Sequence, residues 1–117
     1  MNSLTIITRA AATGPVLEIT GDLDYATAPE LRTALDGLPL TAGQLLILDL
    51  TGLDYCDSSG ITTLLAARNL TIQQNADLAL AAVPDNTSRI LSIVGLDQVF
   101  TFHPDASTAT HPSSAAS

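Results

Sequence analysis

The sequence predicts an α/β domain with a mixed sheet of about five strands, an opening antiparallel hairpin followed by parallel crossovers, and helices packed on the sheet. Two observations support this fold class. The β-rich segments 4–10 and 15–23 are separated by the turn-forming run Ala-Thr-Gly-Pro, which favours a hairpin. From residue 27 onward, segments with helical spacing of apolar residues alternate with short apolar runs, as in sheets built through crossover helices.

Three segments have apolar residues at intervals of three and four, the spacing of one helix face. The first begins at Thr27, the predicted N-cap, with Pro29 in the first turn and Glu30 three residues after the cap. The predicted helices run from Thr27 to about 37–39, over 60–75 and over 87–95. The boundary signals of the second and third helices are the stop at Asn75, the cap at Thr87 and the stop at Gly95.

The strands that follow the hairpin are short apolar runs. Segment 44–50 is nearly all apolar, which predicts a central strand buried on both faces, and 77–83 and 98–103 are predicted as two more strands. Residues 51–60, Thr-Gly-Leu-Asp-Tyr-Cys-Asp-Ser-Ser-Gly, are predicted to be a loop leaving the carboxyl end of strand 44–50. That loop delivers Ser58 to a helix start, at the sheet edge where ligands and chemistry lie in open α/β sheets.

Length and composition predict a single domain over 1–103 and a Ser/Ala/Thr-rich tail over 104–117 that is either disordered or a short helix. Twelve acidic residues against four arginines and no lysine give a formal net charge of −8 and a pI near 4.1. Such a chain repels nucleic acid and anionic membranes, so a basic protein surface is the expected partner. The single Cys56 and the lack of a long apolar run predict a reducing, cytoplasmic setting.

The candidate functional site is the Asp-Ser-Ser-Gly run that begins at Asp57. Two interpretations stay open from the residues alone. Asp and Ser are preferred N-caps, so the run is a capping signal that many globular proteins contain. Alternatively, the unsatisfied N–H groups and positive dipole end of the helix start stabilise a phosphate on the hydroxyl of Ser58.

Other chemistries have little support in the sequence. A serine hydrolase needs a histidine beside its nucleophile, whereas His103 and His111 fall in the last strand and the tail. The carboxylates of 22–24 and 54–57 are interpreted as an acidic rim and not as a metal site, and Cys56 as a packing residue. We therefore expect no enzyme activity, no cofactor and no metal.

Three motifs carry a family resemblance, in the expected chain order and across most of 4–103. They are Gly-Asp-Leu-Asp-Tyr-Ala-Thr-Ala-Pro-Glu-Leu-Arg at 21–32, Cys-Asp-Ser-Ser-Gly-Ile at 56–61 and Arg-Ile-Leu-Ser-Ile-Val-Gly-Leu-Asp-Gln-Val-Phe at 89–100. Together they resemble the motifs of STAS domains, specifically of anti-sigma-factor antagonists. The resemblance implies a STAS-type mixed sheet over residues 1–103.

The resemblance also implies roles for individual residues. Ser58 matches the phosphoacceptor, Asp57 the acid of the same motif, and Asp24 the acid near the phosphorylation site and the kinase interface. Ser59 matches a position that is not usually modified, and Thr62 stands where the family commonly has glycine. The implied partner-binding residues are Asp22, Asp24, Tyr25, Thr27, Asp57, Ser58, Ser59, Gly60 and Thr62.

The function that the resemblance implies is transcription regulation by partner switching in a bacterium. The unphosphorylated chain binds an anti-sigma factor serine kinase of the GHKL type and releases a sigma factor, and phosphorylation at Ser58 ends that binding. A phosphoserine phosphatase resets the switch, so the chain is a substrate and not an enzyme. The alternative is a non-phosphorylated STAS subunit of a lipid-transport ATPase or of a signalling scaffold.

Overall fold

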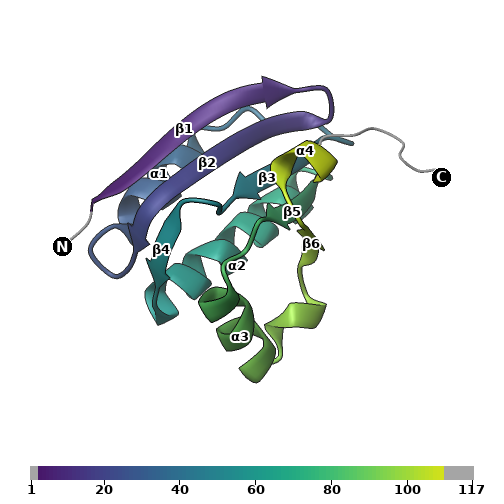
Figure 1. The fold of residues 1–117 in the computed structure, drawn as a ribbon. Coiled ribbons are helices and arrows are strands. Elements are labelled where there is room, and N and C mark those ends of the chain that lie inside the picture. Colours follow the sequence, from purple (N-terminus) through teal and green to yellow (C-terminus); the bar gives the residue numbers. More distant parts are fainter. Residues whose placement is uncertain (1–2, 110–117) are drawn as a thin grey trace.

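The computed structural model of the protein describes residues 3–109 (Figure 1). In chain order its elements are β1 (Leu4–Ala11), β2 (Gly14–Leu23), α1 (Ala28–Asp36), β3 (Leu45–Asp49), β4 (Leu53–Cys56), α2 (Ser58–Gln73), β5 (Asp77–Ala81), α3 (Asp85–Ile93), a 3-10 turn (Leu96–Gln98), β6 (Thr101–His103) and α4 (Ala106–Ala109). In this described part, no helix is long and apolar enough to cross a membrane.

The strands form one mixed sheet, as the sequence predicts. β1 and β2 make an antiparallel hairpin joined by residues 12–13, and β2, β3, β5 and β6 follow as parallel neighbours in the order β1-β2-β3-β5-β6. The central strand β3 lies between β2 and β5 and is buried at Leu46, Ile47 and Leu48, which confirms the expectation of a strand covered on both faces.

The sheet has one strand more than the five predicted. The additional strand is β4, which lies within residues 51–60, the segment predicted to be a loop. The ten-residue strand β2 pairs with β3 along its first half, at Val16–Glu18, and with β4 along its second half, at Gly21–Leu23. Between the two partners, the N–H of Gly21 donates to the carbonyl of Gly52 at 3.0 Å. β4 therefore carries the chain to the carboxyl end of β2 before α2 begins (Figure 1).

The two faces of the sheet are covered differently. One face packs leucine-rich side chains against α1, α2 and α3, with Leu48 of the sheet, Leu64 of α2 and Leu91 of α3 each fully buried. The opposite face has mostly smaller residues, such as Val16 and Ala79, which cluster with Ala106 of the short helix α4. The aliphatic main core fixes where α2 lies, and with it the position of the candidate site.

Two helix stops lie where the sequence predicts them. α2 ends at Gln73 and Asn75 takes the left-handed conformation with φ of 58°, and Gly95 after α3 does the same with φ of 80°. The predicted cap of α3 is wrong: the helix begins at Asp85 after Pro84, and Thr87 lies inside it. Thr87 is buried, so its side chain faces the protein interior and not the helix start.

The C-terminal region also differs in detail from the prediction. The last strand is shorter than 98–103, because Leu96–Gln98 form a 3-10 turn and only Thr101–His103 pair with β5. Within the segment expected to be a disordered tail or a short helix, Ala106–Ala109 form α4. The remaining part of that segment, 110–117, lies outside the described residues.

Candidate functional site

The start of α2 is capped by Asp57, which directly follows β4. Its backbone is extended, with φ of −98° and ψ of −170°, and its Oδ1 accepts a hydrogen bond from the N–H of Gly60 at 3.0 Å. Its own N–H donates to the carbonyl of Leu23 at 3.2 Å, which ties the junction to the end of β2. The capping interpretation is therefore correct for this motif, with the aspartate as the cap.

Because Asp57 caps the helix, neither of the two serines that follow is needed for the cap. Ser58 is the first residue of α2 and is exposed, and Ser59 is half-buried. Within residues 3–109 neither hydroxyl forms a hydrogen bond; only their carbonyls accept, from the hydroxyls of Thr62 and Thr63, both at 2.9 Å. Ser58 thus presents the more accessible hydroxyl of the pair.

Gly60 is buried where α2 meets the ends of β2 and β4. A Cβ at this position would lie 2.6 Å from the carbonyl oxygen of Leu23 and 2.6 Å from Sγ of Cys56. Glycine is therefore required here by close packing. It lets the first turn of α2 approach the strand ends closely, which fixes the direction in which Ser58 is presented.

The neighbouring β2–α1 loop is held by its own side chains. Asp24 Oδ1 accepts from the N–H groups of Ala26 and Thr27, both at 3.0 Å. The hydroxyl of Thr27 donates to the carbonyl of Asp22 at 2.7 Å and accepts from the N–H of Asp24 at 2.9 Å. Thr27 occupies the predicted N-cap position of α1, but its side chain makes no cap hydrogen bond, so the predicted capping arrangement with Glu30 is wrong.

One hydrogen bond joins the loop to the α2 junction. Oδ2 of Asp57 accepts from the N–H of Tyr25 at 3.2 Å, so one carboxylate both caps α2 and holds the loop. The Tyr25 side chain is 82% exposed. The structure therefore brings the two predicted groups, 22–27 and 57–60, into one site.

Tyr55 is a residue of this site that the sequence did not single out. It lies opposite Asp22 in the pairing of β4 with β2 and is 54% exposed. Residues 51–60 were expected to form a loop, and a loop gives no basis for placing one side chain beside the other motif. The sequence did offer one signal for Tyr55: it is one of only four tyrosines and phenylalanines in the chain, and it lies two residues before the Asp-Ser-Ser-Gly run.

Cys56 is a buried residue of the site and not a reactive one. Its side chain packs against the position of Gly60, and burial together with the charge of Asp57 raises the pKa of the thiol from 9.0 to about 12. The thiol is therefore protonated at neutral pH, which removes the nucleophile that redox chemistry needs.

The charge around Ser58 is negative. Asp57 and Asp24 lie in the two joined loops, with Asp22 on β2 and exposed Asp54 on β4. The four arginines lie on other parts of the chain: Arg9 pairs with Glu18 at 2.9 Å, Arg32 with Asp36 at 3.9 Å, and Arg68 and Arg89 lie on α2 and α3. Among residues 3–109, no group of three or more histidine, cysteine or acidic side chains could hold a metal ion.

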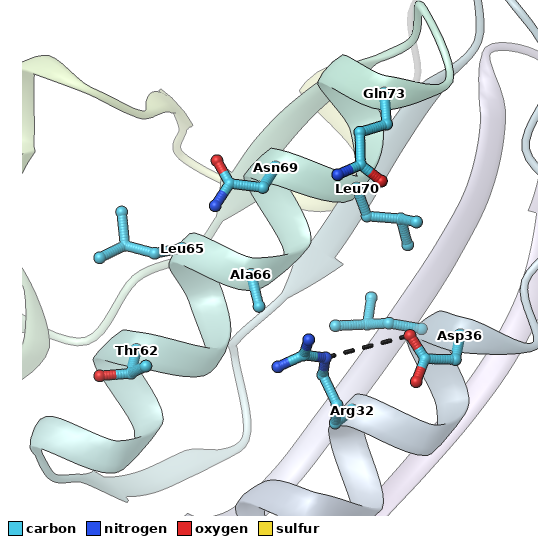
Figure 2. Close-up of a pocket in the computed structure, with 9 residues that line it drawn as sticks. Arg32, Asp36, Thr62, Leu65, Ala66, Asn69, Leu70 and Gln73 are labelled. Carbon is cyan, nitrogen blue, oxygen red and sulfur yellow. Dashed lines mark ion pairs between the residues drawn. The ribbon is translucent and has the colours of Figure 1, made fainter.

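Thr62 lies one helical turn beyond Ser58, at one end of a cleft between α1 and α2 (Figure 2). The cleft has a volume of about 390 Å³; Arg32 and Asp36 line it from α1, and Asn69 and Gln73 from α2. Thr62 is thus the one predicted partner-binding residue that faces this cleft.

The fold and the site define a small α/β module that presents an exposed serine at the start of a capped helix. The chain belongs to the STAS domain family, whose model matches residues 5–109 and so includes α4. This match confirms the resemblance carried by the three sequence motifs.

Individual relatives give the same assignment. The chain is 31% identical to the anti-sigma-B factor antagonist of Listeria monocytogenes over 81 residues, 69% of this chain and 71% of the relative. It is also 31% identical to the anti-sigma-F factor antagonist RsfB of Mycobacterium tuberculosis, over 73% of this chain and 69% of the relative. The crystal structure of an anti-sigma factor antagonist from Mycobacterium paratuberculosis matches with a TM-score of 0.75 and 26% identity, covering 92% of this chain and 94% of that one.

Proposed function

We propose that this protein is an anti-sigma-factor antagonist: its unphosphorylated form binds an anti-sigma factor serine kinase in the cytoplasm and frees a sigma factor, and phosphorylation of Ser58 ends that binding. The observation that carries the proposal is the exposed Ser58 hydroxyl at the first position of α2, left without a structural hydrogen bond because Asp57 caps the helix. The names of the relatives, which antagonise anti-sigma-B and anti-sigma-F factors, support it.

The switch that we propose is electrostatic. A phosphate on Ser58 adds about −1.5 to −2 charges at pH 7, directly beside the carboxylate of Asp57. The N–H of Gly60 is already bonded to Asp57, so the N–H groups of Ser58 and Ser59 are the ones in the first helical turn that can hold the phosphate. The kinase surface that we propose fits the acidic site with an unmodified Ser58 hydroxyl. The phosphate adds negative charge and bulk to this site, which weakens the complex.

In this proposal the chain needs no catalytic group of its own. The kinase supplies ATP and magnesium, and a separate phosphatase removes the phosphate. His103, the one described histidine, lies on β6, which is separated from β4 by other strands of the sheet, so it cannot act as a base for Ser58.

The proposal is tested by mass spectrometry after incubation with ATP, magnesium and each purified GHKL-type anti-sigma serine kinase of the source bacterium. We expect one phosphate on Ser58, none on a Ser58→Ala variant, and normal modification of the matched control Ser59→Ala. Phosphate that persists in Ser58→Ala, or no modification by any such kinase, contradicts the proposal.

Binding tests the charge mechanism separately. Ser58→Asp places a carboxylate where the phosphate would begin, so we expect its affinity for the kinase to fall about tenfold or more in calorimetry. Ser58→Asn has similar size without the charge and serves as the control. Equal affinities of the two variants would rule out charge repulsion. Stable co-purification with a transport ATPase subunit in place of a kinase would instead favour the role of a non-phosphorylated STAS subunit.

A further inference from the structure

The four aromatic residues of the chain divide into two groups with different surroundings. Phe100 and Phe102 contact each other edge to face, with ring centroids 6.5 Å apart, and Phe100 is buried. Tyr25 and Tyr55 are 82% and 54% exposed, and both lie at the Ser58 site. Large exposed rings add little to the stability of a fold, whereas tyrosines are enriched among residues that dominate protein interfaces.

Both tyrosines project from a backbone that hydrogen bonds hold in place. The N–H of Tyr25 donates to Oδ2 of Asp57, and Tyr55 lies within β4, paired opposite Asp22 of β2. Only the side-chain rotation of each ring remains to be ordered when a partner binds. A fixed backbone lowers the entropy loss of binding, so these rings are suited to act as anchors.

The charges around the two rings indicate the chemistry of the partner. Segments 21–27 and 53–60 contain four aspartates and no arginine or lysine. A surface that covers both rings therefore has to supply positive charge at its rim and apolar recesses for the rings. Guanidinium groups meet both demands, because they pair with carboxylates and stack on aromatic faces.

Resting on the proposed function, we infer that Tyr25 and Tyr55 are the main anchors of the complex with the anti-sigma kinase, each ring entering a recess of the kinase that arginine or lysine side chains border. Phosphorylation acts next to one of these anchors. Tyr25 is held by the carboxylate of Asp57, the group nearest in sequence to the new phosphate. Repulsion between phosphate and carboxylate disturbs that hydrogen bond, so the phosphate weakens one anchor as well as repelling the partner.

The test is calorimetry of single variants with the purified kinase that modifies Ser58, in the presence of ADP and magnesium. We expect Tyr25→Ala and Tyr55→Ala each to weaken binding about thirtyfold or more, the size typical of interface hot spots. Tyr25→Phe and Tyr55→Phe, which keep the rings, should stay within about threefold of the wild type. The matched control is Ile72→Ala: Ile72 is 54% exposed, like Tyr55, but lies about 21 Å along α2 from Ser58.

The outcomes separate this inference from the proposed function. If the wild-type chain binds the kinase but both alanine variants bind within threefold of it, the anchor inference alone is overturned. The same holds if Ile72→Ala weakens binding as much as the tyrosine variants. A wild-type chain that binds no anti-sigma kinase overturns both ideas. Thermal unfolding checks each fold, and Tyr25→Ala decides the matter if Tyr55→Ala is unstable, since the ring of Tyr25 is almost fully exposed.

Discussion

Two of the strand-to-helix junctions, β2–α1 and β4–α2, use similar residues for opposite purposes. Each has an aspartate directly after a strand, Asp24 after β2 and Asp57 after β4, and a hydroxyl residue at the start of the helix. At the first junction Thr27 is 7% exposed, and its hydroxyl bridges two backbone groups. At the second, Ser58 is exposed, and its hydroxyl has no hydrogen bond within residues 3–109.

The difference comes from which group satisfies the backbone. In the first junction the threonine side chain is needed to complete the hydrogen bonds of its loop, so it cannot be modified without loss of structure. In the second, Asp57 does that work alone and the next hydroxyl is left accessible. The Ser58 hydroxyl is thus free for chemistry because the neighbouring Asp57 makes the capping hydrogen bond in its place. Three predictions test this contrast, beginning with the largest expected effect.

The close packing at the second junction should make Gly60→Ala the most damaging single-methyl change at either junction. The added carbon meets the backbone oxygen of Leu23 at 2.6 Å, and a backbone atom cannot move aside as a side chain can. We expect a loss of about 3 kcal/mol in the free energy of unfolding, measured by urea denaturation.

The matched control is Gly37→Ala, at the end of α1. There the nearest atom to an added Cβ is 3.7 Å away and φ is −88°, so the substitution should be neutral or slightly stabilising. A change in Gly60→Ala as small as that in Gly37→Ala would show that the close contact at Gly60 is relieved at no cost.

The two hydroxyls should differ in their importance for stability. Thr27→Val keeps the shape but removes the hydroxyl, and with it the bonds to the carbonyl of Asp22 and the N–H of Asp24 at a part-buried place. We expect a loss of about 2 kcal/mol. Ser58→Ala should change the free energy of unfolding by less than about 0.5 kcal/mol, as is usual at exposed positions. Equal losses in urea denaturation would contradict the proposed division of roles.

Local sequence patterns were sufficient for the main elements of this fold. The hairpin, the central strand 44–50 and the stop at Asn75 depend on apolar spacing and turn residues within a few positions of each other. β4 could not be predicted in this way. It has four residues, of which Asp54 and Tyr55 are exposed, and it is stabilised by pairing with β2, about thirty residues earlier in the chain.

For the site too, the local sequence pattern was predictable and the contacts between distant segments were not. The Asp-Ser-Ser-Gly run indicates a helix cap from sequence alone, but not that the aspartate and not a serine would make it. Thr27 and Thr87 show the same uncertainty. The hydroxyl of Thr27 bonds to backbone groups of the loop before α1, and Thr87 is buried inside α3, so neither side chain caps its helix. The bond between Asp57 and Tyr25 joins residues 32 positions apart, so it depends on the fold and on no local signal.

The smallest expected effect distinguishes the two aspartates. Asp24 uses only Oδ1 for its hydrogen bonds to Ala26 and Thr27, whereas Asp57 uses Oδ1 for Gly60 and Oδ2 for Tyr25. An asparagine at position 24 can therefore keep both bonds through its one carbonyl oxygen. An asparagine at position 57 must place an NH₂ group against one of two backbone N–H donors.

We accordingly expect Asp24→Asn to be nearly neutral and Asp57→Asn to lose about 1 kcal/mol, including the lost attraction between the carboxylate and the start of α2. Hydrogen exchange gives the more specific readout. An asparagine at an N-cap keeps its carbonyl oxygen on the helix N–H, here that of Gly60, and so turns its NH₂ group toward Tyr25. The amide of Tyr25 should therefore exchange faster in Asp57→Asn and at the wild-type rate in Asp24→Asn. Unchanged exchange at Tyr25 in both variants would mean that the loop does not depend on the carboxylate of Asp57. The two junctions would then be joined only through the ends of β2 and β4, and a phosphate at Ser58 would have no route to Tyr25 through the Asp57 carboxylate.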